Sequence, residues 1–114
     1  MKGNNKTEKI IWTKPKNKKL VAAFLSLSTT KQTEDFLIDI MTPKEILEFS
    51  NRLCAAQMLL DKNIYTNIEK ETGLSSTTVA RVSKWLNRKG GGYKQVLTNL
   101  DHHQRAKKLQ SDLS

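Results

Sequence analysis

The order of hydrophobic and polar positions along the chain predicts helices and no strand of any length. Between residues 18 and 28, apolar side chains recur at the spacing of one helix face: Leu20, Val21, Phe24, Leu25 and Leu27. After a break at 28–30, a second helical pattern opens at Thr30 or Thr33, with an apolar face formed by Phe36, Leu37, Ile40 and Met41. We therefore expect two amphipathic helices joined by a short turn.

The clearest helix boundary lies at residues 42–45, which read Thr-Pro-Lys-Glu. Thr42 suits the N-cap, Pro43 suits the first helical position, and Glu45 completes a capping box. The helix that begins here is expected to run to about Asp61. Its apolar residues spread over more of its circumference than one small partner face covers: Ile46, Leu47, Phe49, Leu53, Cys54, Ala56, Met58, Leu59 and Leu60. In so short a chain, this breadth favours burial between two subunits.

The C-terminal half of the chain contains the layout of a helix-turn-helix. A short helix is expected over residues 65–72, and Gly73 follows where a helix ends in a left-handed residue. Leu74 fills the corner between the helices, and Ser75 or Ser76 caps the second helix. The sequence therefore predicts an all-α fold that includes this motif.

The second helix of the motif, expected over residues 76–88, has two opposite faces. Apolar residues at spacings of three and four form an inner stripe: Val79, Val82 and Leu86. At about 100° per residue, the opposite side carries a hydroxyl and cations but no acid: Thr77, Arg81, Lys84 and Arg88. Such side chains contact phosphates and base edges. We predict that this helix binds double-stranded DNA through Ser75, Ser76, Thr77, Thr78, Arg81, Lys84 and Arg88.

The charge balance also favours a polyanionic partner. The chain has 114 residues, with 20 Lys and Arg against 11 Asp and Glu, and a formal net charge of +9. Seven lysines stand against Glu8 alone in residues 1–19, and residues 63–89 hold a second basic excess. We interpret the chain as three segments: a flexible basic arm over 1–17, a helical DNA-binding domain over 18–100 and a polar tail over 101–114.

Several other classes of protein find no support in the sequence. No apolar run approaches the roughly 18 residues of a membrane span, and the N-terminus lacks the apolar core of a secretory signal. We interpret the lone Cys54 as a small buried hydrophobe in a cytoplasmic protein. His102 and His103 are adjacent in a polar segment, and Gly90–Gly92 lacks a P-loop pattern. We expect no catalytic, metal or cofactor site and no enzyme.

Two alternatives to DNA readout remain open. The motif can serve a protein interaction module that does not read DNA, which Glu69 and Glu71 on the first helix would suit. RNA binding is the other alternative, although only 6% of the residues are aromatic and a stacking surface is not evident. Because phosphate contacts weaken steeply with salt, salt dependence separates DNA binding from an apolar protein interface.

Over roughly residues 35–100 the chain resembles the Trp repressor superfamily, and within it the uncharacterised Trp repressor-related branch. The matching segments are Met-Thr-Pro-Lys-Glu at 41–45, the run from Leu59 to Leu74 and the run from Ser75 to Asn87, with Gly91–Tyr93 after it. The resemblance implies an all-helical, intertwined homodimer whose two motifs enter successive major grooves. It also implies a last short helix from Tyr93 to about Leu100.

The residues that bind the corepressor in that family are mostly not matched in this chain. Arg81 matches the recognition-helix arginine, whereas Val82 stands for a glycine, Cys54 for the long-helix arginine and Trp85 for a serine. The bulk of Val82 and the loss of a guanidinium argue against L-tryptophan as the effector, and any other effector is unknown. Trp85 either fills the vacated cavity or is an ordinary packing aromatic.

Overall fold

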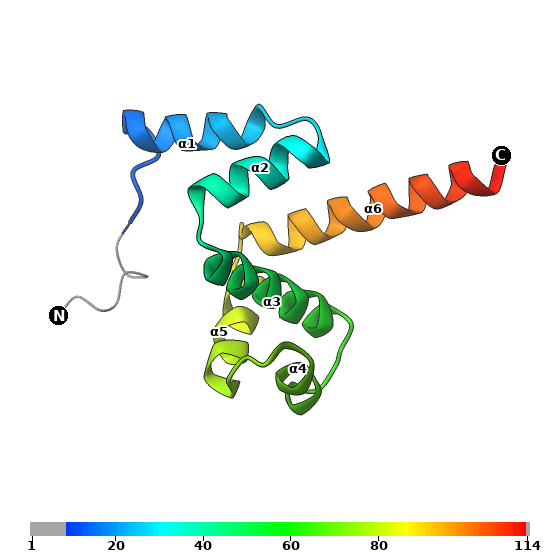
Figure 1. Cartoon of the computed structure of the whole chain (residues 1–114). Helices are drawn as coiled ribbons and strands as arrows, with labels where there is room; N and C mark the ends of the chain where they lie inside the picture. Colours follow the sequence, from blue (N-terminus) through cyan, green and yellow to red (C-terminus); the bar gives the residue numbers. More distant parts are fainter. Residues whose placement is uncertain (1–8, 114) are drawn as a thin grey trace. The chain divides into compact units, whose positions relative to one another are not determined.

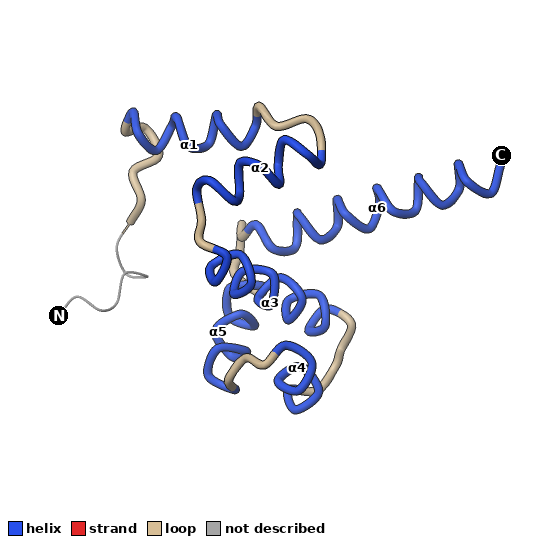
Figure 2. The backbone as a smooth tube through the Cα atoms, in the orientation of Figure 1, coloured by secondary structure: helices blue, strands red, loops and turns tan. Residues whose placement is uncertain are grey.

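The computed structural model of the protein describes residues 9–113, with side chains up to residue 111. That range contains six helices and no strand (Figures 1 and 2). In chain order they are α1 (Pro15–Leu25), α2 (Thr30–Ile40), α3 (Pro43–Leu60), α4 (Tyr65–Thr72), α5 (Ser76–Leu86) and α6 (Gly92–Leu113). The predicted all-α class is confirmed. The first eight residues of the expected basic arm lie outside the described residues.

The chain divides into two compact units, Met1–Thr42 and Pro43–Ser114. The division falls at the boundary predicted from the Thr-Pro-Lys-Glu sequence, where Pro43 starts α3 and Glu45 lies in its first turn. The helix that follows ends at Leu60, one residue before the expected end. The local capping signal therefore located both a helix start and the division between the units.

In the first unit, α1 and α2 are short helices joined by a turn. Pro15 starts α1, where its missing N–H costs no hydrogen bond. Thr29 caps α2, because its side-chain oxygen accepts a hydrogen bond from the Gln32 backbone N–H at 3.1 Å. The rings of Phe24 and Phe36 meet edge to face, with centroids 5.3 Å apart. No residue of α1 or α2, both within the described range, is buried.

In the second unit, α3 packs against α4, α5 and α6, and α5 also packs against α4 and α6. Ala55 and Ala56 on α3 are fully buried, and their small side chains let the neighbouring helices approach closely. The other buried apolar residues of the described chain are Ile68, Val79, Val82, Leu86 and Leu97. The inner stripe predicted for α5 is confirmed, since its members are 0%, 0% and 4% exposed.

The end of α3 is held by backbone hydrogen bonds that set the start of the motif. Lys62 adopts a left-handed conformation with φ 68°. The backbone N–H of Asn63 donates to the Met58 carbonyl at 3.0 Å, and the Asn63 side-chain amide donates to the same oxygen at 3.1 Å. These bonds satisfy a carbonyl that the helix end leaves without a partner. They fix the direction in which the chain enters α4.

Besides α1, which begins at Pro15 inside the segment expected to be a flexible arm, three features differ from the expectations. First, α6 runs to Leu113 rather than ending near Leu100, although its C-terminal part has no buried side chain among the described residues. Second, α5 ends at Leu86, so Arg88 follows the helix rather than closing it. Third, Cys54 is exposed, which makes its interpretation as a buried hydrophobe wrong for the single chain. The wide apolar surface of α3 is not covered on that side, where Leu47 is also 62% exposed.

Candidate nucleic-acid interface

The turn between α4 and α5 is built from one glycine and one buried hydroxyl. Gly73 ends α4 in a left-handed conformation with φ 73°, and its N–H donates to the Glu69 carbonyl at 2.8 Å. Thr72 is 6% exposed; its hydroxyl donates to the Ile68 carbonyl at 2.7 Å and accepts from the Leu74 N–H at 3.2 Å. The predicted role of Gly73 is confirmed. The role of Thr72 was missed, because a threonine at a helix end gives no distinctive sequence signal.

The N-terminus of α5 is capped by a pair of hydroxyls. The Ser75 side chain accepts from the Thr78 backbone N–H at 3.1 Å, and the Ser75 hydroxyl donates to the Thr78 hydroxyl at 3.1 Å. Ser75 is therefore the N-cap that the sequence left open between two serines. Ser76 and Thr77 lie exposed beside it. The positive end of the helix dipole and these hydroxyls form a surface suited to a phosphate.

The exposed side of α5 carries the residues predicted to contact DNA. Thr77, Arg81 and Lys84 are exposed, on the side of the helix opposite the buried Val79 and Val82. Residues 75–89 include no acid, and the ion pairs among the described residues lie elsewhere. The basic stripe, defined as Thr77, Arg81, Lys84 and Arg88, is therefore not neutralised by an acid of the described chain.

The basic stripe continues past the end of α5. Asn87 ends the helix, and its side-chain amide donates to the Ser83 carbonyl at 2.9 Å. Arg88 then lies exposed in the following turn, with Lys89 exposed beside it. Lys89 was not among the predicted contacts. Its position next to Arg88 in a basic segment is the sequence signal by which it could have been predicted. The structure thus places six predicted residues on or at the start of α5 and Arg88 just after it.

A cationic and aromatic cluster lies where α3 meets α5. The Arg52 guanidinium carbon is 5.6 Å from the ring centroid of Phe49 and 5.6 Å from that of Trp85. The Arg52 side chain also pairs with Glu48 at 2.6 Å. The resemblance places Cys54 at the position of the family's long-helix arginine and so predicts that no guanidinium faces α5 there. That inference is wrong, because α3 presents Arg52 to α5 while Cys54 is exposed.

Tyr93, near the start of α6, packs against the core of the second unit. Burial raises the pKa of its phenol above the ordinary value of 10.0, and the nearby Arg52 charge partly offsets this rise. His102 and His103 lie exposed on α6. Among the described residues, no three His, Cys, Asp or Glu side chains are grouped as a metal site would require. In the same range, no helix combines the length and hydropathy needed to cross a bilayer.

Comparison with known proteins agrees with this geometry. A profile of the family described as Trp repressor protein matches residues 16–101. The chain is 37% identical over 78 residues to "Uncharacterized protein YerC" of Bacillus subtilis (strain 168), covering 68% of this chain and 75% of that protein. It is also similar to the crystal structure of a TrpR like protein from Eubacterium eligens, with a TM-score of 0.72, 34% identity and coverage of 86% of this chain and 96% of that chain. These matches confirm the resemblance found in the sequence: the chain belongs to the Trp repressor protein family.

Proposed function

We propose that the protein is a sequence-specific transcriptional regulator, a repressor, that binds double-stranded DNA through α5. Its family is one of helix-turn-helix regulators rather than enzymes. The observation that carries the proposal is the basic stripe, which is exposed and makes none of the ion pairs of the described chain, while the opposite side of the same helix is buried. Arginine at such a position bonds guanine bidentately, and lysine binds phosphates.

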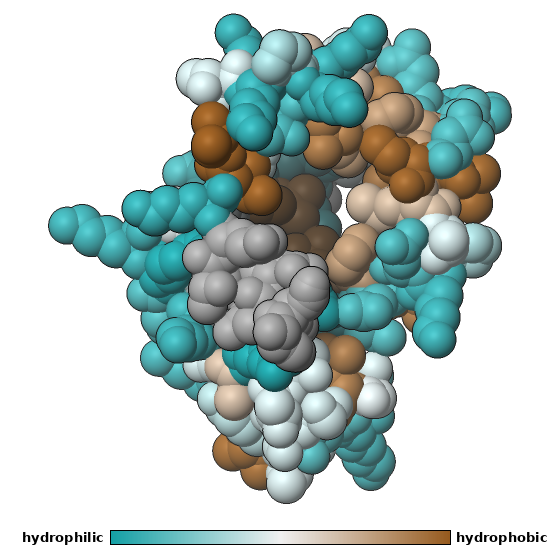
Figure 3. Space-filling view, turned by 90° about the vertical axis from the view of Figure 1, so that its left-hand side faces the viewer, coloured by the Kyte–Doolittle hydropathy of each residue, from teal (hydrophilic) through white to brown (hydrophobic). Residues whose placement is uncertain are grey.

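A homodimer is part of this proposal, and the first unit supplies the main support. Its apolar side chains remain exposed: Leu20 41%, Val21 42%, Phe24 40% and Leu25 80%. On the face drawn in Figure 3, hydrophobic residues gather among hydrophilic ones at the level of α1 and α2. In the second unit, Phe49 on α3 and Val96 and Leu100 on α6 are also exposed. Exposed apolar surface of this kind marks an interface, and a second copy carries the complementary apolar faces.

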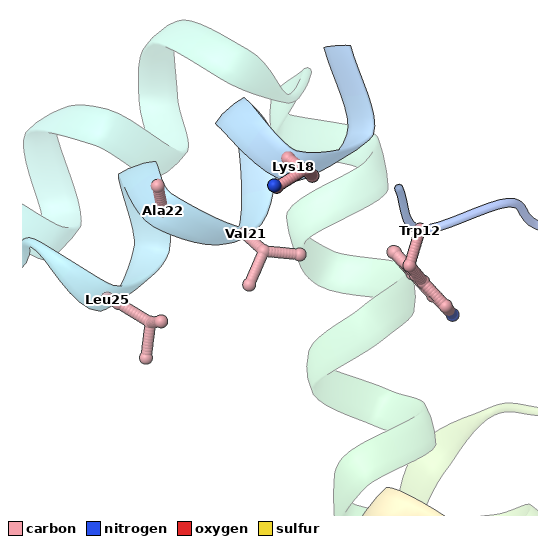
Figure 4. Close-up of a pocket in the computed structure, with 5 residues that line it drawn as sticks. All are labelled: Trp12, Lys18, Val21, Ala22 and Leu25. Atoms are coloured by element: carbon pink, nitrogen blue, oxygen red, sulfur yellow. The ribbon is translucent and has the colours of Figure 1, made fainter. Parts of the chain in front are cut away.

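A shallow apolar groove on α1 is a candidate part of that dimer interface. It has a volume of about 480 Å³ and is lined by Trp12, Lys18, Val21, Ala22 and Leu25. Val21 and Leu25 project to the same side of α1, and the ring of Trp12 lies beyond the start of the helix (Figure 4). The stem of Lys18 can cover apolar surface while its ammonium stays in water. A helix of the second copy suits this groove better than a charged ligand.

L-tryptophan is not the effector in this proposal. Val82 is fully buried in the core, so the space beside the recognition helix is already occupied by a branched side chain. Trp85, an indole of the chain itself, lies half-buried beside Arg52. Calorimetric titration of the protein with L-tryptophan should show no saturable binding. Saturable micromolar binding would refute this part of the proposal.

Selection of duplexes from a random pool, with the purified full chain as bait, tests the main proposal. A regulator that reads DNA as a dimer should enrich a palindromic site whose half-sites lie one helical turn apart, about 10 base pairs. Enrichment of no site would refute sequence-specific binding. A single, unrepeated half-site would contradict the dimer while leaving direct readout in place.

Two substitutions in the basic stripe should then have different effects on the enriched site. Arg81→Ala should cost about 1–3 kcal/mol and relax preference at one base position, because the side chain is expected to read a guanine. Lys84→Ala should weaken binding to all duplexes alike, because a lysine contact to phosphate carries no base information. Equal, sequence-independent losses for both variants would contradict base readout by Arg81.

The alternative of a protein interaction module finds one supporting observation. Ile64 is 65% exposed and Tyr65 41% exposed at the start of α4, on the helix that also carries Glu69 and Glu71. The salt dependence of binding separates the two proposals. DNA binding through several cations should weaken by orders of magnitude between about 50 and 200 mM salt. Binding through exposed apolar residues should change little over the same range.

A further inference from the structure

The Arg52 clasp, defined as Phe49, Arg52 and Trp85, joins the long helix to the helix that carries the basic stripe. The Arg52 guanidinium lies 5.6 Å from both ring centroids, one ring on its own helix and one on α5. Arg52 stands one turn before Ala55 and Ala56, on the side of α3 that packs against the motif. The clasp therefore sits at the rim of the core, with Phe49 still 41% exposed.

Both a hydrogen bond and two aromatic rings contact the Arg52 guanidinium. Its side chain is only 26% exposed and pairs with Glu48, four residues earlier on the same helix, at 2.6 Å. The Arg52 Nε is buried and has no hydrogen-bond partner among the described residues. A buried donor without an acceptor is costly, and the faces of two aromatic rings are the groups on hand that stabilise the cation. Arg52 therefore leaves one buried N–H, at Nε, without a hydrogen bond at this contact.

The position of Trp85 on α5 explains why this contact matters for the basic stripe. At about 100° per residue, Trp85 lies on the flank of α5, roughly 40° from Arg81 and roughly 60° from Val82. On the α3 side the buried core is formed by two alanines, and larger apolar residues pack against it only partly buried: Leu53, Met58, Leu59 and Leu60. Trp85 is the large side chain at the C-terminal end of the contact between α3 and α5. If the Trp85 ring shifted on α3, α5 would rotate about its axis, and Arg81 and Lys84 would change direction.

We propose that Arg52 and Trp85 are positioning residues, whose stacking sets the orientation of α5 on α3 and so aligns the basic stripe with the DNA groove. The proposal rests on the proposed function for its effect on DNA, but the clasp itself is a property of the folded chain. The sequence left two roles open for Trp85, filling the vacated cavity or ordinary packing. The proposal favours the first, because the ring contacts the Arg52 guanidinium. The recognition helix is then held by the chain's own indole and guanidinium, with no small molecule required.

The first test uses the fluorescence of Trp85. The chain has two tryptophans, so Trp12→Phe leaves Trp85 as the reporter. In that background Arg52→Met, which keeps an apolar stem but removes the charge, should shift the emission to longer wavelength as the indole gains solvent. Arg105→Met is the matched control, because Arg105 also pairs with an acid four residues earlier, Asp101 at 3.3 Å, but contacts no aromatic ring of the described chain. An unchanged emission in the Arg52 variant would overturn the proposal.

The second test is a double-mutant cycle on DNA affinity, with Arg52→Met and Trp85→Leu measured singly and together. Each single variant should lose about three- to thirtyfold in affinity for the enriched duplex, the range expected for one cation–π contact. The loss for a mixed-sequence duplex should stay within about twofold, because nonspecific phosphate contacts tolerate small rotations of α5. The double variant should be little worse than either single one. Additive losses, or equal losses on both duplexes, would overturn the proposal.

A conservative variant guards against a simple folding defect. Trp85→Phe keeps a ring beside Arg52 and should lose less specific affinity than Trp85→Leu; equal losses would show that the ring plays no part. If the selection enriches no duplex, the proposed function fails, while the clasp is still tested by the emission shift. It is also tested by the coupling of Arg52→Met and Trp85→Leu in denaturant unfolding, where purely additive effects would count against it.

Discussion

The helices α1 and α5 are both 11 residues long and both amphipathic, but they differ in what covers their apolar sides. In α5, Val79 and Val82 are fully buried against the other helices of the second unit. In α1 no residue is buried, and Leu25 is 80% exposed. The second unit packs four helices around one core, whereas the described part of the first unit has two helices and one pair of rings that meet edge to face.

This contrast separates two kinds of information in the sequence. A hydrophobic period predicts that a helix has an inner side, but it does not say whether the covering surface comes from the same chain. The second unit answers the question within one chain. The apolar residues of the first unit, like several on α3 and α6, stay exposed, and we propose that a second copy covers them. The following changes test whether the two units differ in this way.

The largest effect should come from truncating the core of the second unit. Ile68 is fully buried, so Ile68→Ala should lower the free energy of unfolding by about 2–5 kcal/mol through lost burial and a cavity. Ile38→Ala, at a residue 60% exposed on α2, is the matched control and should cost about 0.5 kcal/mol or less in dilute solution. Denaturant unfolding followed by circular dichroism measures both. Equal losses would show that the first unit has a core after all.

The next effect concerns association rather than folding. Leu25→Gln places an amide in the groove of α1, and a buried leucine contributes about 1.5–3 kcal/mol, so the dimer should dissociate at least about tenfold more readily. Lys19→Gln, at an exposed residue of the same helix, should leave association almost unchanged. Sedimentation equilibrium over a range of concentrations gives the two constants. A chain that is monomeric throughout, or a leucine variant that dimerises normally, would contradict our account of the first unit.

Helix starts and the turn of the motif could be predicted from sequence because their causes are local. Pro43, Gly73 and Ser75 act on their own turns, and the structure places each where its chemistry requires. The length of α6 was missed because Ala106, Leu109 and Leu113, although at helical spacing, are few among the polar residues of a segment that was interpreted as a tail. The exposure of Cys54 was also missed, because it depends on which side of α3 the other helices cover.

The candidate site was predicted in part for the same reason. The basic stripe follows from the period of one helix, so Arg81 and Lys84 were assigned to an exposed side that the structure shows. The contact between Arg52 and Trp85 joins residues that are distant in sequence and depends on how α3 and α5 cross. A comparison of motifs gives no information on how two helices cross. It pointed to Cys54, which lies two residues away from the arginine that contacts Trp85.

A smaller effect is expected at the turn of the second unit. Gly73 has φ 73°, and a Cβ built there would meet no atom within 4 Å, so Gly73→Ala tests backbone strain alone. We expect a loss of about 1 kcal/mol in unfolding free energy, with the left-handed strain partly offset by a stiffer unfolded chain. Gly92→Ala also meets open space but lacks the left-handed φ, and should cause no loss. Equal effects in thermal unfolding would mean that the turn does not constrain the motif.

The smallest effect is a dependence on alkaline pH that should be confined to the second unit. Burial raises the pKa of Tyr93 above 10.0, so the folded chain holds this proton more tightly than the unfolded chain does. The resulting stabilisation is complete below pH 10.0, the ordinary value, and is lost as the pH rises through the folded pKa. Wild type should therefore lose slightly more unfolding free energy than Tyr93→Phe between about pH 9 and 11, since the two chains differ only in this phenol.

The exposed phenol of Tyr65, also in the second unit, provides the control for that measurement. Tyr65 is 41% exposed, so Tyr65→Phe should leave the alkaline loss of wild type in place. Arg52→Met should enlarge the loss, because the Arg52 charge is what lowers the pKa of Tyr93 and so limits its rise. If Arg52→Met instead left the alkaline profile unchanged, the Arg52 charge would have no effect on the pKa of Tyr93. The start of α6 would then be coupled to α3 by packing alone, and not through the charge that also holds Trp85.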